Sequence, residues 1–243
     1  MVQIILFITA TILYVAVYPI TGYYQTKLLR KSNTVGVHDK SSWYRQSMLW
    51  SWIPTIIIII ALLSDGYSLP SLGLDYINPG KNGISRWIVV VTLISYIAYL
   101  CYLVYNIIAI RFDKSKKSEY ADKIPAELRF ALPVSKKEKR DWKMLSVTAG
   151  ITEEIQYRGY LFFALPLLFS NISIWIVLIA SSLVFGIGHI YQGKEAYKPL
   201  LAGIYFGFLY IVLGSVIPVI IIHILQDLVV TDLIEEPKKS DFL

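Results

Sequence analysis

The sequence predicts an all-α protein, a polytopic membrane bundle of about seven transmembrane helices. Of its 243 residues, 56% are hydrophobic, and the mean hydropathy is +0.56. Long uncharged apolar runs recur from one end of the chain to the other, whereas a soluble domain of ordinary composition has few of them. Basic residues gather in some of the segments between these runs, which is typical of membrane topology.

The apolar runs define the predicted spans, because a helix needs about 20 apolar residues to cross the hydrocarbon core. The first run has no charge and no basic segment before it, so we expect a retained anchor rather than a cleaved signal peptide. The sixth run is short. The seven predicted spans are Val2–Tyr24, Ser47–Ser64, Trp87–Ile110, Leu145–Phe169, Ile172–Tyr191, Pro199–Leu213 and Val216–Val230.

The distribution of Lys and Arg predicts the orientation of these spans. Segment 27–45 contains five basic residues and segment 111–143 contains eleven, whereas segment 65–86 contains two and the turns at 170 and 214 contain none. Cytoplasmic loops carry the excess of Lys and Arg. We therefore expect the N-terminus outside and the C-terminus in the cytoplasm, and the formal charge of +6 then requires no nucleic-acid partner.

We expect four parts along the chain. They are a three-span part (1–112), a basic cytoplasmic linker (113–144), a four-span catalytic core (145–230) and a cytoplasmic tail (231–243). In the linker, Ile124, Leu128 and Leu132 recur every four residues and predict one apolar helical face, which would belong either to a helix on the membrane surface or to a solvated helix. The only cysteine, Cys101, cannot form an internal disulfide.

Ionisable residues inside the predicted spans are the strongest functional signal. Charge at membrane depth is costly, so such residues need a partner or a water-filled cavity and are functional candidates by default. The first three spans contain none in their interiors. The candidates all belong to the last four spans and are Glu153, Glu154, Arg158, His189, His223 and Asp227.

The spacing of these residues along the predicted helices indicates which side chains can contact one another. Glu154 and Arg158 lie four residues apart on one helix and can form a structural ion pair. Glu153 is rotated by about 100° from Glu154, so it remains to face another group and could act as a general base. His223 and Asp227 also lie four residues apart on one face, where the carboxyl group could accept a hydrogen bond from the imidazole or lie beside it.

The predicted depths allow four of these residues to meet in one cavity that opens to the cytoplasmic half. Such a set suits hydrolysis by activated water, with Glu153 taking the proton and His189 orienting the water. His223 and Asp227 would stabilise the developing oxyanion, if the acid is protonated or the histidine donates. Glu153, His189 and His223 are equally candidate ligands for Zn²⁺. The sequence leaves both interpretations open.

Three motifs follow one another, each in its own span: "EEIQYR" (Glu153–Arg158), "FGIGH" (Phe185–His189) and "HILQD" (His223–Asp227). In this order they resemble the CPBP family, which includes CAAX prenyl endopeptidases and bacterial relatives that act in bacteriocin processing and self-immunity. The resemblance covers roughly residues 145–230.

The resemblance implies an intramembrane glutamate- or metallo-endopeptidase in which Glu153 and His189 activate water. It implies that His223 and Asp227 form the oxyanion site, with Glu154 as a further candidate catalytic residue and Arg158 as its partner. Asp227 stands where the eukaryotic enzymes have Asn, and an ionised Asp would repel an oxyanion. The short chain resembles bacterial members, so we expect a multi-pass cell-membrane protein with a peptide or membrane-protein substrate rather than a prenylated one.

Two other classes of function compete with the protease. A bacteriocin self-immunity protein or a regulatory scaffold, bound to a sensor or signalling membrane partner, would keep the fold without hydrolysis. A proton-coupled transporter also uses intramembrane carboxylates and histidines, but the sequence has no visible inverted repeat and no ionisable residue inside the first three spans. The complete motif set favours the protease.

Overall fold

The computed structural model describes residues 2–31, 37–80 and 82–235. Helix accounts for 81% of the structure, and every regular element among the described residues is a helix, so the all-α prediction is confirmed. Part of the predicted tail (236–243) and part of the first basic segment (32–36) lie outside the described residues.

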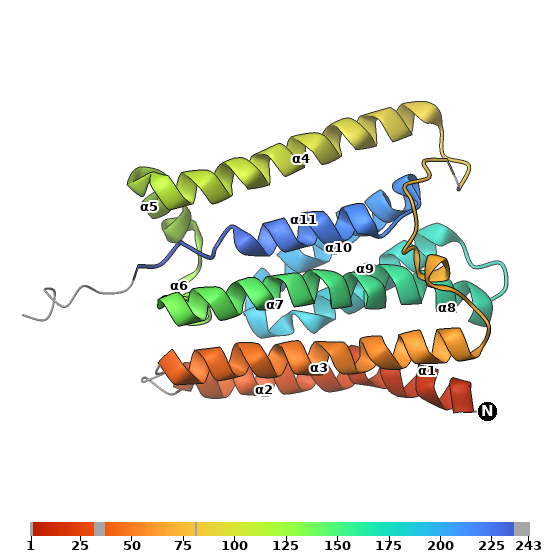
Figure 1. Ribbon diagram of the computed structural model, residues 1–243, viewed down its shortest axis with the longest axis horizontal. Helices are drawn as coiled ribbons and strands as arrows, with labels where there is room; N and C mark the ends of the chain where they lie inside the picture. Colours follow the sequence, from red (N-terminus) through yellow and green to blue (C-terminus); the bar gives the residue numbers. More distant parts are fainter. Residues whose placement is uncertain (1, 32–36, 81, 236–243) are drawn as a thin grey trace, which may run out of the picture.

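The long helices lie side by side along one direction, with α7 near the middle of the bundle (Figure 1). α3 and α11 both pack on α7, α9 packs on α10, and α4 packs against α11 and α10. The elements are α1 (Val2–Ile12), η1 (Leu13–Val17), α2 (Tyr18–Lys31), α3 (Val37–Ser64), η2 (Leu69–Leu72), α4 (Arg86–Phe112), α5 (Lys114–Lys123), α6 (Ala126–Arg129), α7 (Lys136–Glu154), η3 (Ile155–Tyr160), α8 (Leu161–Leu168), α9 (Ile174–Gly188), η4 (Ile190–Ala196), α10 (Tyr197–Leu213) and α11 (Ile217–Leu228).

Three helical stretches within the described residues are long and apolar enough to cross a membrane: Lys40–Ser64, Arg86–Phe112 and Ile190–Leu213. They contain the second, third and sixth predicted spans. The helices Ile174–Gly188 and Ile217–Leu228 are apolar but shorter. The chain is therefore a membrane protein, whereas the count of seven spans, the orientation and the four-part division remain predictions.

The linker does not form the single apolar helix that its spacing predicts. α5 ends at Lys123, and Ile124 adopts an extended backbone because the residue before a proline is disfavoured in the helical region. After Pro125 only the four-residue α6 follows. Ile124, Leu128 and Leu132 line a cavity of the bundle.

The end of the linker is fastened to α3. The Tyr44 hydroxyl donates to the Ala131 carbonyl over 2.6 Å, and Lys40 Nζ donates to the Leu132 carbonyl over 3.1 Å. Lys40 also lies 3.3 Å from Oε2 of the fully buried Glu138. Glu138 closes a capping box with Ser135 at the start of α7. These contacts fix the start of α7, and hence the helix that carries Glu153.

A proline inside α3 ties the first helices to the bundle. Pro54 has no N–H for the carbonyl of Trp50, four residues earlier. The Tyr18 hydroxyl of α2 donates to that carbonyl over 2.5 Å. Thr11 and Tyr160 share a second hydrogen bond, 2.7 Å long, between α1 and η3. The first helices therefore have a fixed position beside α3 and η3.

Candidate functional site

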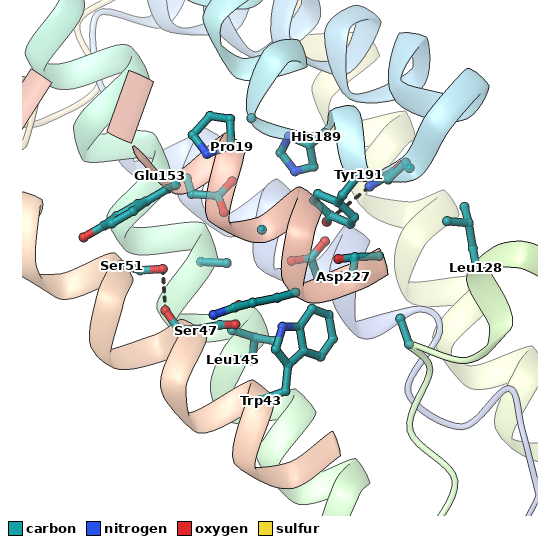
Figure 2. A pocket seen from close by; sticks show the side chains of 18 of the residues that line it. Pro19, Trp43, Ser47, Ser51, Leu128, Leu145, Glu153, His189, Tyr191 and Asp227 are labelled. Atoms are coloured by element: carbon teal, nitrogen blue, oxygen red, sulfur yellow. Dashed lines mark hydrogen bonds between the residues drawn. The ribbon is translucent and has the colours of Figure 1, made fainter. Parts of the chain in front are cut away.

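A cavity of about 560 Å³ lies inside the bundle, and four of the predicted residues line it. Glu153 comes from α7, His189 from the C-terminal end of α9, and His223 and Asp227 from α11. Figure 2 shows Glu153, His189 and Asp227 pointing into the same space. α2, α3 and the linker supply further walls, so the N-terminal part helps to enclose the site.

The motif "EEIQYR" passes from α7 into the six-residue π-helical turn η3, an irregularity that is frequent at functional sites. The predicted ion pair is present: Arg158 Nη1 donates to Glu154 Oε1 over 2.8 Å, and both side chains are fully buried. Arg158 Nη2 donates to the Gly203 carbonyl over 3.2 Å. Its guanidinium carbon lies 4.5 Å from the centre of the Phe185 ring and 5.5 Å from that of Phe206.

Close packing of α9 and α10 makes the Gly203 contact possible. A Cβ atom at Gly203 would lie 3.3 Å from both Ser182 Cα and Phe185 Cδ1. At Gly207 a Cβ atom would clash with the Leu178 side chain. These glycines let the two helices approach each other, as small residues do at helix interfaces in membranes. The approach brings a backbone carbonyl within reach of Arg158.

His223 forms a hydrogen bond with Glu154, a contact that the sequence did not predict. Its Nδ1 donates to Glu154 Oε1 over 2.6 Å, since a carboxylate only accepts. Its Nε2 lies 3.9 Å from Glu153 Oε2 and 3.8 Å from Asp227 Oδ2. Asp227 therefore lies beside the imidazole rather than hydrogen-bonded to Nδ1. Glu154 and His223 lie 69 residues apart in the sequence and on different helices, so spacing within one helix could not predict their contact.

His189 is the residue that ends α9. Its Nδ1 donates to the Phe185 carbonyl over 2.8 Å, because a carbonyl oxygen can only accept. In the neutral ring, Nε2 is then an acceptor. The preceding Gly188 also lines the cavity, where a Cβ atom would lie 3.1 Å from the Tyr157 hydroxyl.

Other residues that hold the site were not singled out by sequence reasoning. Trp142 Nε1 donates to the backbone carbonyl of Asp227 over 3.0 Å. Gln156 Nε2 donates to Thr55 Oγ1 over 2.8 Å and so fastens η3 to α3. The ring of Tyr191 lies 5.8 Å from that of His189 and lines the cavity. Aromatic and amide residues at helical spacing are typical of packing, so the sequence carried no separate signal for them.

The arrangement of the candidate ligands does not form a metal site among the described residues. Among the described residues, no group of three or more His, Cys, Asp and Glu side chains is arranged to hold a metal ion. One nitrogen of each site histidine is already bonded, to the Phe185 carbonyl and to Glu154. The Zn²⁺ site of Glu153, His189 and His223 stays a prediction, and no step below passes through a metal.

A family model described as type II CAAX prenyl endopeptidase Rce1-like matches residues 141–229. Comparisons with curated proteins and with solved structures gave no match. The matched segment runs from α7 to the end of α11 and contains all six candidate residues. The family is a protease family, which supports an enzyme in the membrane. Residues 141–229 are therefore similar to the Rce1-like proteases of the CPBP family, which supports the resemblance that the three motifs indicated.

Proposed function

We propose that the protein is an intramembrane endopeptidase that hydrolyses a peptide bond with water activated by Glu153 and His189. One observation carries the proposal: two carboxylates and two imidazoles from three helices line a single cavity inside a membrane bundle. A cluster of this kind is costly at membrane depth and is a functional site by default. The similarity of residues 141–229 to a protease family points the same way.

Glu153 is the proposed general base. Its Oε2 atom is buried and accepts no hydrogen bond from the described residues, so it can accept one from a water molecule. Neutral His189, held by the Phe185 carbonyl through Nδ1, offers Nε2 as a second acceptor for the same water. The water oxygen attacks the substrate carbonyl carbon while its proton passes to Glu153.

His223 is the proposed donor to the oxyanion that forms on the substrate. Glu154 accepts the Nδ1 proton of His223 and is itself paired with Arg158. A proton on Nε2 then points into the cavity as a fixed hydrogen-bond donor. A preorganised donor of this kind stabilises the charge that develops in the transition state. Glu154 is accordingly a positioning residue that acts through His223.

We propose a multi-pass arrangement in a bacterial cell membrane, with seven spans, the N-terminus outside and the C-terminus in the cytoplasm. The cavity supports this arrangement, because residues of the basic linker, among them Lys123, Ile124 and Leu128, line one of its ends. Figure 2 shows Leu128 and Trp43 on the side away from Glu153. A peptide or membrane-protein substrate would enter from the cytoplasmic side.

The test is cleavage of a degenerate peptide mixture by the full chain in proteoliposomes, read by mass spectrometry. Glu153→Gln and His189→Ala should each lower the rate by about 10²–10⁴-fold, the usual contribution of general acid–base groups. Glu195→Gln is the matched control, because Glu195 lines the same cavity but pairs with Lys198 over 2.6 Å. This variant should cleave at close to the wild-type rate.

Retained cleavage in both site variants would refute the proposed mechanism. If the wild type cleaves nothing and biological function survives both substitutions, the protein acts by binding. It would then be a self-immunity protein or a scaffold for a membrane partner.

A further inference from the structure

The hydroxyl of Tyr157 lies against the segment that carries His189. A Cβ atom added to Gly188 would lie 3.1 Å from this hydroxyl oxygen. Beyond the chain neighbours of Gly188 and the backbone of α9, it is the only heavy atom of the described residues within 4 Å of that position. Tyr157 and Gly188 both line the cavity, and Gly188 directly precedes His189. The glycine therefore leaves the room that the hydroxyl occupies.

The ring of Tyr157 is held from two sides. Its centroid lies 5.5 Å from that of Tyr14 and 5.1 Å from that of Phe185, with interplanar angles of 81° and 86°. Edge-to-face contacts of this kind are favourable for aromatic pairs. Ser181 Oγ also donates to the Tyr157 backbone carbonyl over 2.7 Å. These contacts fix the direction of the side chain.

The hydroxyl takes no part in this packing. Among the described residues it has no hydrogen-bond partner, since the hydrogen bond from Ser181 reaches the backbone of Tyr157. A phenylalanine would make the same ring contacts without placing a polar group in a residue that is only 6% exposed. A buried tyrosine hydroxyl usually finds a partner. This hydroxyl is therefore suited to a group that enters the cavity.

Both members of the proposed water-activating pair come close to this hydroxyl. Glu153 precedes Tyr157 by four residues, about one helical turn, and both side chains line the cavity. His189 follows Gly188, and the Phe185 ring that packs on Tyr157 lies 4.7 Å from the His189 ring. The carboxylate, the imidazole and the hydroxyl thus face one part of the cavity.

We propose that Tyr157 is a further catalytic residue, whose hydroxyl donates a hydrogen bond to the oxygen of the attacking water. The inference rests on the proposed function and deepens it, because it adds a third group around the same water. Glu153 and neutral His189 accept the two hydrogens of that water. One lone pair of its oxygen accepts from Tyr157, and the other attacks the carbonyl carbon. Tyr157 keeps its own proton, and the proton of the water passes to Glu153.

Tyr157→Phe removes the hydroxyl and keeps the ring. The assay uses the full chain in proteoliposomes and a peptide found in the degenerate mixture. kcat should fall by about 10–10²-fold at unchanged KM, because a reacting group that is out of place costs on that order. The melting temperature should not fall below that of the wild type, because no hydrogen bond within the protein is lost.

Tyr160→Phe is the matched control from the same helical turn. The Tyr160 hydroxyl shares a hydrogen bond with Thr11, and Tyr160 is not among the described residues that line the cavity. The control should therefore melt at a lower temperature and keep the wild-type kcat. The two variants are expected to separate catalysis from stability in opposite directions.

Gly188→Ala tests the position of the hydroxyl. The added methyl group would displace the hydroxyl oxygen of Tyr157, so kcat should fall in the wild-type background. In the Tyr157→Phe background that oxygen is gone, so Gly188→Ala should add little to the loss. Residues in contact show such non-additive effects.

A wild-type kcat in Tyr157→Phe would overturn the proposal. A rise in KM at unchanged kcat would also overturn it, because the hydroxyl would then bind substrate rather than water. A loss of kcat together with a lower melting temperature would assign a structural role instead. Fully additive losses in the double variant would show that the hydroxyl does not act beside Gly188. A wild type that cleaves no peptide would refute the proposed function itself.

Discussion

His223 Nδ1 and Glu154 Oε1 lie 2.6 Å apart, and the same oxygen lies 2.8 Å from Arg158 Nη1. One oxygen of Glu154 thus accepts hydrogen bonds from both His223 and Arg158 and holds the two side chains in place. All three side chains are buried. The charge of Glu154 is therefore part of both the stability and the geometry of the cluster.

Glu154→Gln should destabilise the protein by about 3–5 kcal/mol, because it leaves the guanidinium of Arg158 buried without its counter-charge. The free energy of unfolding, or the melting temperature in detergent micelles, measures this loss. Glu119→Gln is the matched control, since Glu119 contacts Lys116 over the same 2.8 Å but on the exposed helix α5. This control should melt like the wild type. Equal melting of Glu154→Gln and wild type would show that the buried pair contributes nothing.

Gly203→Val should push α10 away from α9 and move the Gly203 carbonyl away from Arg158. Overpacking of a close contact of this kind costs about 1–3 kcal/mol. The melting temperature of the variant in detergent micelles measures this loss of stability. Gly22→Ala is the control, because a Cβ atom there meets nothing within 4 Å, and alanine favours a helix more than glycine does. A Gly203→Val variant as stable as Gly22→Ala would contradict the role given to this packing.

Ser135→Ala should weaken the start of α7 by about 0.5–2 kcal/mol, the usual cost of losing an N-cap. Ser135 Oγ accepts from the Glu138 backbone N–H, and Glu138 in turn reaches Lys40. Hydrogen exchange of the first turn of α7 measures the effect locally. Ser173→Ala, at the cap of α9, provides the comparison, because the Ser173 side chain accepts a longer hydrogen bond, 3.4 Å, from the Trp175 backbone N–H. A smaller effect at Ser135 than at Ser173 would be evidence against the fastening of the linker to α3.

The proposed orientation predicts which single cysteines react with an impermeant maleimide in intact cells. On a Cys101→Ser background, Tyr76→Cys should be labelled from outside, since Tyr76 is 89% exposed in the segment between α3 and α4. Glu119→Cys in α5 should react only in inside-out vesicles. Labelling of Glu119→Cys in intact cells would reverse the topology, and would place the mouth of the cavity on the outer side.

Much of the site could be predicted because charge at membrane depth is costly. That cost singled out the six ionisable residues inside the last four predicted spans. The four-residue spacing of Glu154 and Arg158 predicted their ion pair. The Glu154–His223 bond could not be predicted, because it depends on how α7 and α11 meet in space. The fold class followed from hydropathy, whereas the count of seven spans stays a prediction, since apolar length alone does not separate short buried helices from crossing ones.

The linker shows a second limit. A four-residue repeat in Ile124, Leu128 and Leu132 predicted a helical face, but Pro125 interrupts the helix within that repeat. The apolar side chains instead line the cavity. Periodicity indicated that these side chains face the same way and left open which surface they contact. A proline within such a repeat has to be given more weight than the period.

The walls of the cavity come from both parts of the chain, whereas the family match begins only at residue 141. The reacting groups thus come from one stretch of the chain, whereas the enclosure of the cavity depends on both parts. A descendant that kept residues 141–229 and changed only the cavity-facing side chains of α2, α3 or the linker would retain the reacting groups and admit different molecules. Selection for new targets can therefore act on these side chains, as long as the contacts of α3 and the linker with α7 and η3 are kept.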